Sequence, residues 1–217
     1  MKTLPMRANT TNGLLFTFCG LDGCGKTTML QKLCADPEFT FPIFVTKQPT
    51  DAVRRSDIFR TYMDSPDHSA YDYRSLSLLA AADRLQHVKS TVEPAMRRGE
   101  TVLSDRYYYS CLANLRARGY GNDAWIYEIG THMIRPDIAF FFDVPVETAL
   151  ARVRSRPAER DRFIDIPLQY RLREEYLQIC RINNGVLIST AVSEQESYER
   201  VKEEIRKVIK QNERYSI

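Results

Sequence analysis

The chain has 217 residues, of which 43% are hydrophobic and 27% are charged, and its formal net charge is +3. This length and apolar content are typical of one folded domain with a full core. The charge is small and spread along the chain, so no nucleic-acid partner is indicated.

No apolar run approaches the ~18 residues of a membrane-spanning helix. The first residues, MKTLPMRANTTNG, lack the apolar middle of a signal peptide. Five cysteines without a C-x-x-C pair suit reduced thiols, and we expect Cys19 and Cys34 to pack in the core. These features predict a cytoplasmic protein without a membrane segment.

The first predicted elements are a strand over 14–19 and a helix over 28–34, joined by GLDGCGKTT (20–28). The spacing G-x-x-x-x-G-K-T matches the phosphate-binding loop, whose backbone N–H groups hold phosphates. Strand, loop and helix occur in the order that this motif requires. We predict a nucleoside triphosphate site formed by Gly20, Gly23, Cys24, Gly25, Lys26, Thr27 and Thr28.

Within this loop, Lys26 is expected to reach the β and γ phosphates, and the Thr27 hydroxyl is expected to bind Mg²⁺. We expect the Lys26 side chain to face ligand or solvent and to take no part in core packing. The carboxylate of Asp22 is unusual among groups that hold phosphate, and it requires a separate explanation.

Strand-like and helix-like segments alternate along the remainder of the chain. Further strands are predicted at 43–46, 101–104, 138–144 and 186–189. Helices are predicted over 75–98, around the turn at 119–122, and over 146–154 and 168–183; Ser193 and Glu196 form a capping box that opens a final charged helix. This order predicts an α/β fold with a five-stranded parallel sheet covered on both faces. Residues 1–12 are interpreted as an N-terminal extension and residues 13–217 as a single domain.

In such a sheet, ligands bind beyond the carboxyl ends of the strands. Asp22, the segment KQPT (47–50) and the pair Asp105 and Arg106 follow three of the predicted strands, so they should converge on one rim. Arginines and a carboxylate facing a triphosphate indicate a second substrate that is anionic and carries hydroxyl groups.

Four segments carry a combined pattern: GLDGCGKTT, AADRLQH (81–87), SDRYYYS (104–110) and RPDIAFFFDVPVETALAR (135–152). Together they resemble the thymidylate kinase family of nucleoside monophosphate kinases, and the similarity covers most of residues 13–190. The resemblance implies the P-loop nucleotide kinase fold and transfer of the γ-phosphoryl group of ATP to dTMP or a related nucleoside monophosphate. It also implies a need for Mg²⁺ and a homodimer packed through helices.

The resemblance assigns roles by position. Asp22 would hold the 3′-hydroxyl of the acceptor sugar, Arg60 and Arg106 would hold its phosphate, and Arg84 would reach the base. The acceptor site that it implies consists of Asp22, Arg60, Arg84, Arg106, Ser110 and Asn114. Lys26 would follow the transferred phosphoryl group, and Asp105 would act with Thr27 in the magnesium shell.

The segment ARVRSRPAERDRF (151–163) is rich in arginine and lies where the family has a lid over the donor phosphates. The phosphate-binding loop has no arginine of its own, and phosphoryl transfer requires charge neutralisation as the γ group moves. We therefore predict a small Arg-rich lid over about 152–163, with Arg154 and Arg160 as catalytic residues beside Lys26, Asp105 and Arg106.

Two positions depart from the family pattern. Ala80 replaces an aromatic residue that stacks on thymine, and Asn114 replaces an aromatic residue that crowds the 2′ position of the sugar. The base and sugar of the acceptor therefore stay open, and they include a ribonucleotide, a purine nucleotide or a modified base. Tyr71, Tyr73 or Tyr108 would supply a replacement ring.

Two alternatives remain at this point: a kinase for another acceptor, such as a deoxynucleoside or a modified nucleotide, and a non-catalytic nucleotide-binding regulatory protein. Related deoxynucleoside kinases place a glutamate after the second strand to assist a hydroxyl nucleophile, and this chain has Gln48 there. An amide cannot act as a base, which argues against the first alternative. The intact set of Lys26, Thr27, Asp105 and Arg106 argues against the second.

Overall fold

The computed structural model describes residues 2–64, 67 and 71–211. Within them, parallel strands form one five-stranded sheet in the order β2-β3-β1-β4-β5. The strands are β1 (Leu15–Gly20), β2 (Ile43–Lys47), β3 (Thr101–Asp105), β4 (Ile138–Asp143) and β5 (Val186–Ser189). The parallel sheet and the approximate position of every strand confirm the prediction.

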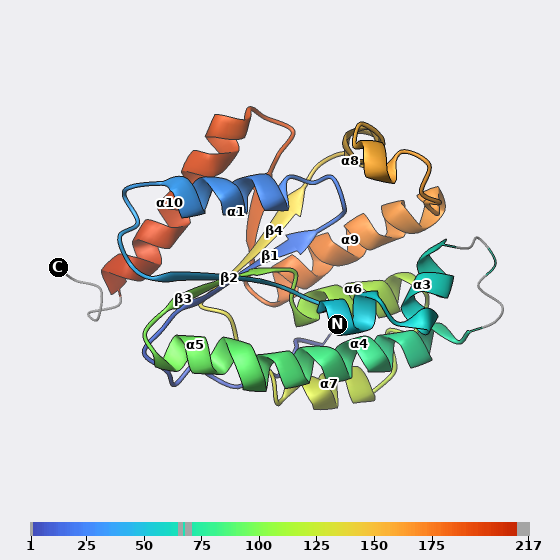
Figure 1. Ribbon diagram of the computed structural model, residues 1–217, viewed down its shortest axis with the longest axis horizontal. Helices are drawn as coiled ribbons and strands as arrows, with labels where there is room; N and C mark the ends of the chain where they lie inside the picture. Colours follow the sequence, from blue (N-terminus) through green and yellow to red (C-terminus); the bar gives the residue numbers. More distant parts are fainter. Residues whose placement is uncertain (1, 65–66, 68–70, 212–217) are drawn as a thin grey trace.

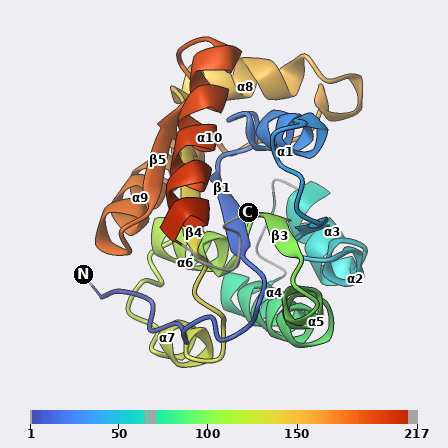
Figure 2. The same cartoon turned by 90° about the vertical axis from the view of Figure 1, so that its left-hand side faces the viewer.

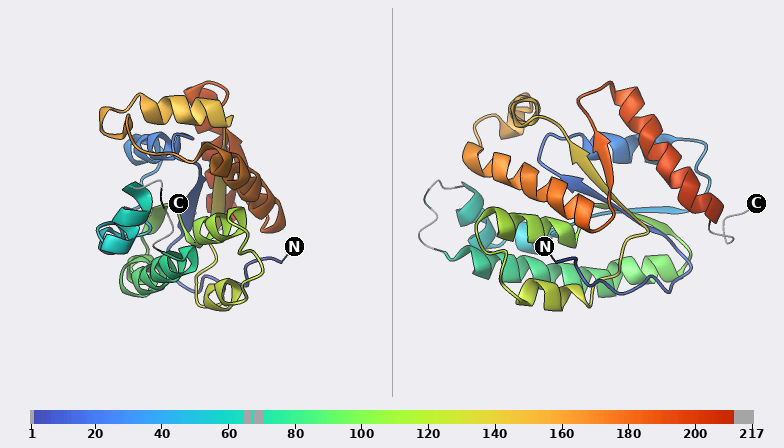
Figure 3. Two further views of the ribbon diagram at one scale, coloured as in Figure 1. Left: turned by 90° about the vertical axis from the view of Figure 1, so that its right-hand side faces the viewer. Right: turned by 180° about the vertical axis from the view of Figure 1, so that it is seen from behind.

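Helices cover both faces of this sheet (Figures 1 and 2). One face is covered by α1 (Lys26–Ala35) and α10 (Glu194–Gln211), and the other by α5 (Glu93–Arg97), α6 (Tyr108–Ala117) and α9 (Ile166–Ile182). Two further helices, α4 (Tyr73–His87) and α7 (Trp125–Gly130), pack outside α6. The view from behind shows α9 and α6 side by side along the sheet (Figure 3). The core between these layers includes the fully buried rings of Phe16, Phe18, Phe140 and Phe141.

The long helix predicted over 75–98 is interrupted. Helix α4 begins at Tyr73, where the Asp72 carboxylate accepts a hydrogen bond from the Arg74 N–H, and the residues from Val88 to Val92 form a π-helical turn before α5. Pro94 has no N–H, so the α-helical bond to the Ser90 carbonyl cannot form. The wider turn accommodates this loss.

The segment between β2 and α4 contains two helices, α2 (Asp51–Arg54) and α3 (Asp57–Asp64), which the sequence pattern does not predict. The peptide bond between Gln48 and Pro49, just before α2, is cis. Both helices lie over the carboxyl ends of β2 and β3, so they form one wall of the site described below.

Residues 2–12 are an integral part of the fold. Leu4 and Met6 are buried, and Arg7 forms a parallel bridge with Ile134 and an ion pair with Glu93. The predicted capping box is confirmed, because Ser193 and Glu196 exchange hydrogen bonds between side chain and backbone at the start of α10.

All five cysteines are free thiols. Cys19 is fully buried, as expected, and burial raises its pKa to about 11. Cys34 is exposed, so its predicted place in the core is wrong, because it lies on the outer side of α1. Across the described residues, every helix is too short or too polar to span a bilayer.

Candidate active site

The phosphate-binding loop connects β1 to α1 at the centre of the sheet. Gly23 and Gly25 have φ values of 82° and 94°, a region that favours glycine. A Cβ atom on Gly23 would lie 2.2 Å from the Ala149 carbonyl oxygen, so a larger residue does not fit there. Gly20, Gly23, Gly25, Lys26, Thr27 and Thr28 line the adjoining cavity, whereas the Cys24 side chain is buried behind the loop.

The Lys26 side chain is 6% exposed, and its ammonium group lies inside the loop. Its Nζ atom donates to the carbonyl oxygens of Gly20 at 3.2 Å and Leu21 at 2.7 Å, and it lies 3.5 Å from the Cys24 sulfur. Lys26 thus faces the ligand cavity, as expected, but its ammonium group is buried in the loop and is not solvated. These carbonyl oxygens accept hydrogen bonds from the charged Lys26 ammonium group at the point where phosphates bind in such loops.

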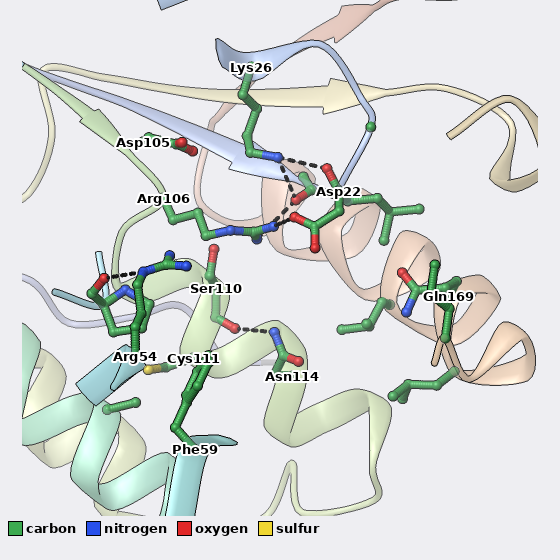
Figure 4. A pocket seen from close by; sticks show the side chains of 18 of the residues that line it. Asp22, Lys26, Arg54, Phe59, Asp105, Arg106, Ser110, Cys111, Asn114 and Gln169 are labelled. Atoms are coloured by element: carbon green, nitrogen blue, oxygen red, sulfur yellow. Dashed lines mark hydrogen bonds and ion pairs between the residues drawn. The ribbon is translucent and has the colours of Figure 1, made fainter. Parts of the chain in front are cut away.

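Asp22 and Arg106 form an ion pair beside the loop (Figure 4), and Arg162 joins the cluster through a second ion pair with Asp22. Arg106 Nη2 donates to Asp22 Oδ1, and Arg162 Nη2 donates to Asp22 Oδ2 at 2.9 Å. Burial would raise the pKa of Asp22, but the charges of Arg106, Lys26 and Arg162 outweigh it and hold that pKa well below its usual value. Asp22 is therefore a carboxylate at every physiological pH.

Arg106 has a φ of 67°, which is uncommon outside glycine and turns the chain sharply after β3. The turn is stabilised by the Arg106 N–H, which donates to the Phe18 carbonyl at 2.8 Å, and by the Ser104 hydroxyl, which donates to the Arg106 carbonyl at 2.6 Å. Arg106 Nη1 donates to the Gly20 carbonyl and to the Tyr176 hydroxyl, both at 3.1 Å. Its guanidinium is thereby held between the donor loop and the neighbouring cavity.

Asp105 ends β3 with a buried carboxylate whose Oδ1 atom has no hydrogen-bond partner among the described residues. The nearest cation is Lys47, whose Nζ lies 3.8 Å from Asp105 Oδ2. Thr27, in the first turn of α1, lines the same cavity. Mg²⁺ is commonly held by one or two protein oxygens together with substrate phosphates and waters, and an unpartnered carboxylate oxygen with a hydroxyl fits that chemistry.

A cavity of about 830 Å³ extends from the loop into the space bounded by α3, α4, α6 and α9. The predicted acceptor residues Asp22, Arg60, Arg84, Arg106, Ser110 and Asn114 all line it. Arg84 is 3% exposed, its Nη1 donates to the Ala80 carbonyl at 2.9 Å, and its buried Nε atom has no partner. The structure thus brings the predicted donor and acceptor residues to one continuous space.

Arg54 and Arg55 line this cavity as well, and the sequence pattern did not identify either of them. The Arg54 Nε donates to the Pro49 carbonyl at 2.8 Å. The pKa of Arg54 is lowered mainly by burial and also by the nearby charges of Arg106 and Arg84. The carboxylate of Asp105 raises it by a smaller amount. The local excess of positive charge suits a bound anion such as a phosphate.

The three rings considered as replacements differ in position. Tyr73 lines the cavity, and burial raises its pKa to about 12. Tyr108 is fully buried and donates to the Ile126 carbonyl, and Tyr71 is not among the lining residues. Phe59 lines the cavity from α3 and points toward Cys111 (Figure 4), a ring that the sequence pattern did not identify.

The arginines of the predicted lid have different surroundings. Arg156 and Arg162 line the cavity, whereas Arg154 and Arg160 are exposed and contact each other, since Arg154 Nη1 donates to the Arg160 carbonyl. Arg152 donates to the Thr190 carbonyl at 3.0 Å and so joins α8 (Val146–Arg154) to the chain after β5. In this conformation the site contains Arg162 and not the two arginines predicted to act.

A parallel sheet of order β2-β3-β1-β4-β5, with a phosphate-binding loop after its central strand and an arginine-lined cavity beside it, defines a P-loop phosphotransferase. The family model described as "Thymidylate kinase" matches residues 18–205. A "Probable thymidylate kinase" of Pyrococcus horikoshii is 35% identical over 187 residues, which is 83% of this chain and 89% of the relative. The "Thymidylate kinase" of Geobacillus sp. is 34% identical over 188 residues, which is 82% of this chain and 89% of the relative. The "Thymidylate kinase" of Lactobacillus acidophilus is 32% identical over 181 residues, which is 78% of this chain and 82% of the relative. The chain belongs to the thymidylate kinase family.

Proposed function

We propose that the protein transfers the γ-phosphoryl group of ATP to the 5′-phosphate of dTMP or of a related (deoxy)nucleoside monophosphate. The observation that carries this proposal is the continuity of the cavity. A phosphate-binding loop and a separate arginine-lined space meet at Lys26, Asp22 and Arg106, without a wall between them. Two phosphorylated substrates can therefore approach end to end, which is the arrangement that phosphoryl transfer requires.

On the donor side, the loop N–H groups would bind the ATP phosphates, and Lys26 would exchange its carbonyl partners for the β and γ oxygens. Thr27 and Asp105 would hold Mg²⁺, directly or through water. The metal ion would neutralise phosphate charge during transfer. The unpartnered Oδ1 atom of Asp105 supports this assignment.

On the acceptor side, Arg106 and Arg54 would hold the monophosphate, with Arg60 nearer the entrance. A phosphate monoester with a second pKa near ~6 is mostly a dianion at neutral pH, so it needs orientation and not deprotonation. Arginines supply that orientation through paired hydrogen bonds. Gln48, which follows β2, would be a poor base for a hydroxyl acceptor, and this favours a monophosphate over a nucleoside.

Asp22 would hold the 3′-hydroxyl of the acceptor sugar. Its two oxygens are ion-paired to Arg106 and Arg162, so both arginines fix the carboxylate at the junction of the two substrate spaces. Arg154 and Arg160 remain proposed ligands of the moving phosphoryl group, and this role would require the lid, about 152–163, to rearrange when ATP binds. Arg162 would act from the position that it already occupies.

We also infer that the protein works as a cytoplasmic homodimer. Leu78 and Leu79 on α4 are 43% and 37% exposed, and they give this helix an apolar outer side that a second copy would cover. Sedimentation at micromolar concentration tests this inference, and a species with the 25.2 kDa mass of one chain alone would contradict it.

The function is tested by measuring ADP formation that depends on added dTMP in the presence of ATP and Mg²⁺. Lys26→Ala should lower the rate by ~10³ or more, since it removes a phosphate ligand that acts in the transition state. Lys32→Ala is the matched control, because Lys32 lies on the same helix and pairs with Glu194 outside the cavity. A Lys26→Ala rate within about tenfold of the wild-type rate would refute the proposed donor site.

A further inference from the structure

At the C-terminal end of α6, the cavity is lined by an arginine held only by neutral groups. Arg118 follows the last residue of α6, and its Nε donates to the Tyr62 hydroxyl at 3.1 Å. Its Nη1 donates to the carbonyl oxygen of Asn114 at 3.2 Å and to the Asn114 Oδ1 atom at 2.9 Å. Its Cζ atom lies 3.9 Å from the centroid of the Tyr73 ring, so the guanidinium also packs against an aromatic face.

Arg118 forms no ion pair with any carboxylate in the described part of the chain, and its Nη2 group makes no hydrogen bond there. The three neutral partners fix the plane of the guanidinium and leave its Nη2 group as the donor for a ligand. Arg84, which is buried on the opposite helix, has an Nε atom without a partner. Both arginines therefore offer donors to the cavity, and neither brings an acceptor.

The position of Arg118 along α6 decides which part of an acceptor it meets. Arg106 follows β3, Arg54 at the end of α2 lies close enough to feel its charge, and α6 leads away from this phosphate end of the cavity. Arg118 lies eight positions after Ser110, which corresponds to about 12 Å of helix. A monophosphate with its phosphate at Arg106 would therefore extend its base toward Arg118.

We propose that Arg118 is a specificity-determining residue that donates hydrogen bonds to carbonyl oxygens of the acceptor base, and that it selects oxo bases over adenine. This inference rests on the proposed function. A guanidinium only donates, so it matches a base edge with carbonyl oxygens and opposes an exocyclic amino group. Tyr73 and Asn114 act here as positioning residues, because they hold the guanidinium plane of Arg118.

The contacts of Asn114 leave its side-chain amide no free end for the 2′ position of the acceptor sugar. Its Nδ2 donates to the Ser110 carbonyl at 2.9 Å, and its Oδ1 accepts from Arg118. Both ends of the amide are therefore occupied within α6. The smaller residue at position 114 makes room for Arg118 and anchors it.

The test measures dissociation constants by calorimetry without ATP, for the wild-type protein and for Arg118→Gln. The ligands are dTMP, dAMP and deoxyribose 5-phosphate, which has no base. We expect the wild-type protein to bind dTMP at least tenfold more tightly than dAMP, and Arg118→Gln to weaken dTMP binding about tenfold. Binding of deoxyribose 5-phosphate should change less than twofold, since it has no base. Binding of dAMP should not weaken, because the glutamine oxygen can accept a hydrogen bond from the adenine amino group that the guanidinium opposes.

Arg74→Gln is the matched control, because Arg74 packs against the Tyr120 ring at 4.9 Å and pairs with Asp72 outside the cavity. Arg118→Lys, which keeps the charge and loses the planar donors, should show an intermediate loss for dTMP. If Arg118→Gln weakens all three ligands equally, or none of them, the inference is wrong. If the wild-type protein binds no dTMP, the proposed function fails and the inference fails with it.

Discussion

Asp22→Asn separates the structural and substrate-binding roles of the carboxylate in the phosphate-binding loop. The substitution keeps the shape of the side chain and removes its charge. It leaves Arg106, 16% exposed, and Arg162, 27% exposed, without their shared partner. The perturbation thus acts on two ion pairs and on one proposed contact to the acceptor sugar.

The effect on stability can be worked from these exposures. Hydrogen bonds between charged groups contribute roughly 1.5–3 kcal/mol when buried and less than ~1 kcal/mol when exposed. Asp22 is 41% exposed, so the loss of both pairs should cost about 1–2 kcal/mol. For a domain of this size that corresponds to a fall in Tm of roughly 2–8 °C.

The pH dependence of this loss has a defined sign. The pKa of Asp22 is held below its usual value in the folded protein, so its contribution is fully present above the unfolded value of ~3.9. It is lost only as the pH falls through the still lower folded value. The stability difference between wild type and Asp22→Asn should therefore be constant from pH 5 to pH 8.

The substrate role is tested by kcat/KM for dTMP and for its analogue without the 3′-hydroxyl. A hydrogen bond from that hydroxyl to a carboxylate should make the wild-type enzyme prefer dTMP by ~10- to 100-fold. In Asp22→Asn the preference should fall at least fivefold, because a neutral amide accepts a weaker bond. Asp72→Asn, which changes an aspartate outside the cavity, should keep the full preference. An unchanged preference in Asp22→Asn would show that the carboxylate only pairs with the arginines.

Three other predictions concern the lid, the acceptor base and a buried ion pair of α10. Arg162→Ala should lower kcat and raise KM for the acceptor, because Arg162 holds Asp22. Arg154→Ala should lower kcat alone. Steady-state kinetics with the opposite pattern would assign the acceptor site to Arg154 and the moving phosphoryl group to Arg162. Ala80→Phe should improve kcat/KM for dTMP by ~10-fold through stacking, and a loss with every acceptor would mean that the ring blocks the cavity. Lys202→Met should lower the free energy of unfolding by about 1–2 kcal/mol at pH 7, since Lys202 pairs with Asp36 at 2.7 Å. That hydrogen bond and others lower the pKa of Asp36 to about 2, so the difference measured by urea unfolding should persist to about pH 4 and shrink as the pH approaches 2.

The sheet and the donor loop could be predicted because their signals are local. The phosphate-binding loop follows from glycines and a lysine at fixed spacing, and each strand follows from a short apolar run such as IAFFFDV. Asp105 and Arg106 were placed correctly on the rim, because the carboxyl ends of parallel strands share one edge.

The remaining features depend on irregular backbone and on contacts between distant segments. Residues 151–163 contain several arginines, and no periodicity tells which of them faces the cavity, so Arg162 could not be chosen over Arg154. Arg118 looks like an ordinary charge at the end of a helix until the fold brings it against Tyr73. The burial of Lys26 could not be predicted either. Its partners are backbone carbonyl oxygens of the loop, and their positions cannot be read from the sequence.

The central claim is that the acceptor is a nucleoside monophosphate. It is tested most directly by incubating the protein with ATP, Mg²⁺ and a panel of deoxy- and ribonucleoside monophosphates, with thymidine as the acceptor without phosphate, and by separating the products. We predict formation of the corresponding diphosphate, with dTMP among the substrates used, one ADP released for each diphosphate formed, and no product from thymidine. Phosphorylation of thymidine in place of dTMP, or the absence of a diphosphate product with every monophosphate, would contradict the claim.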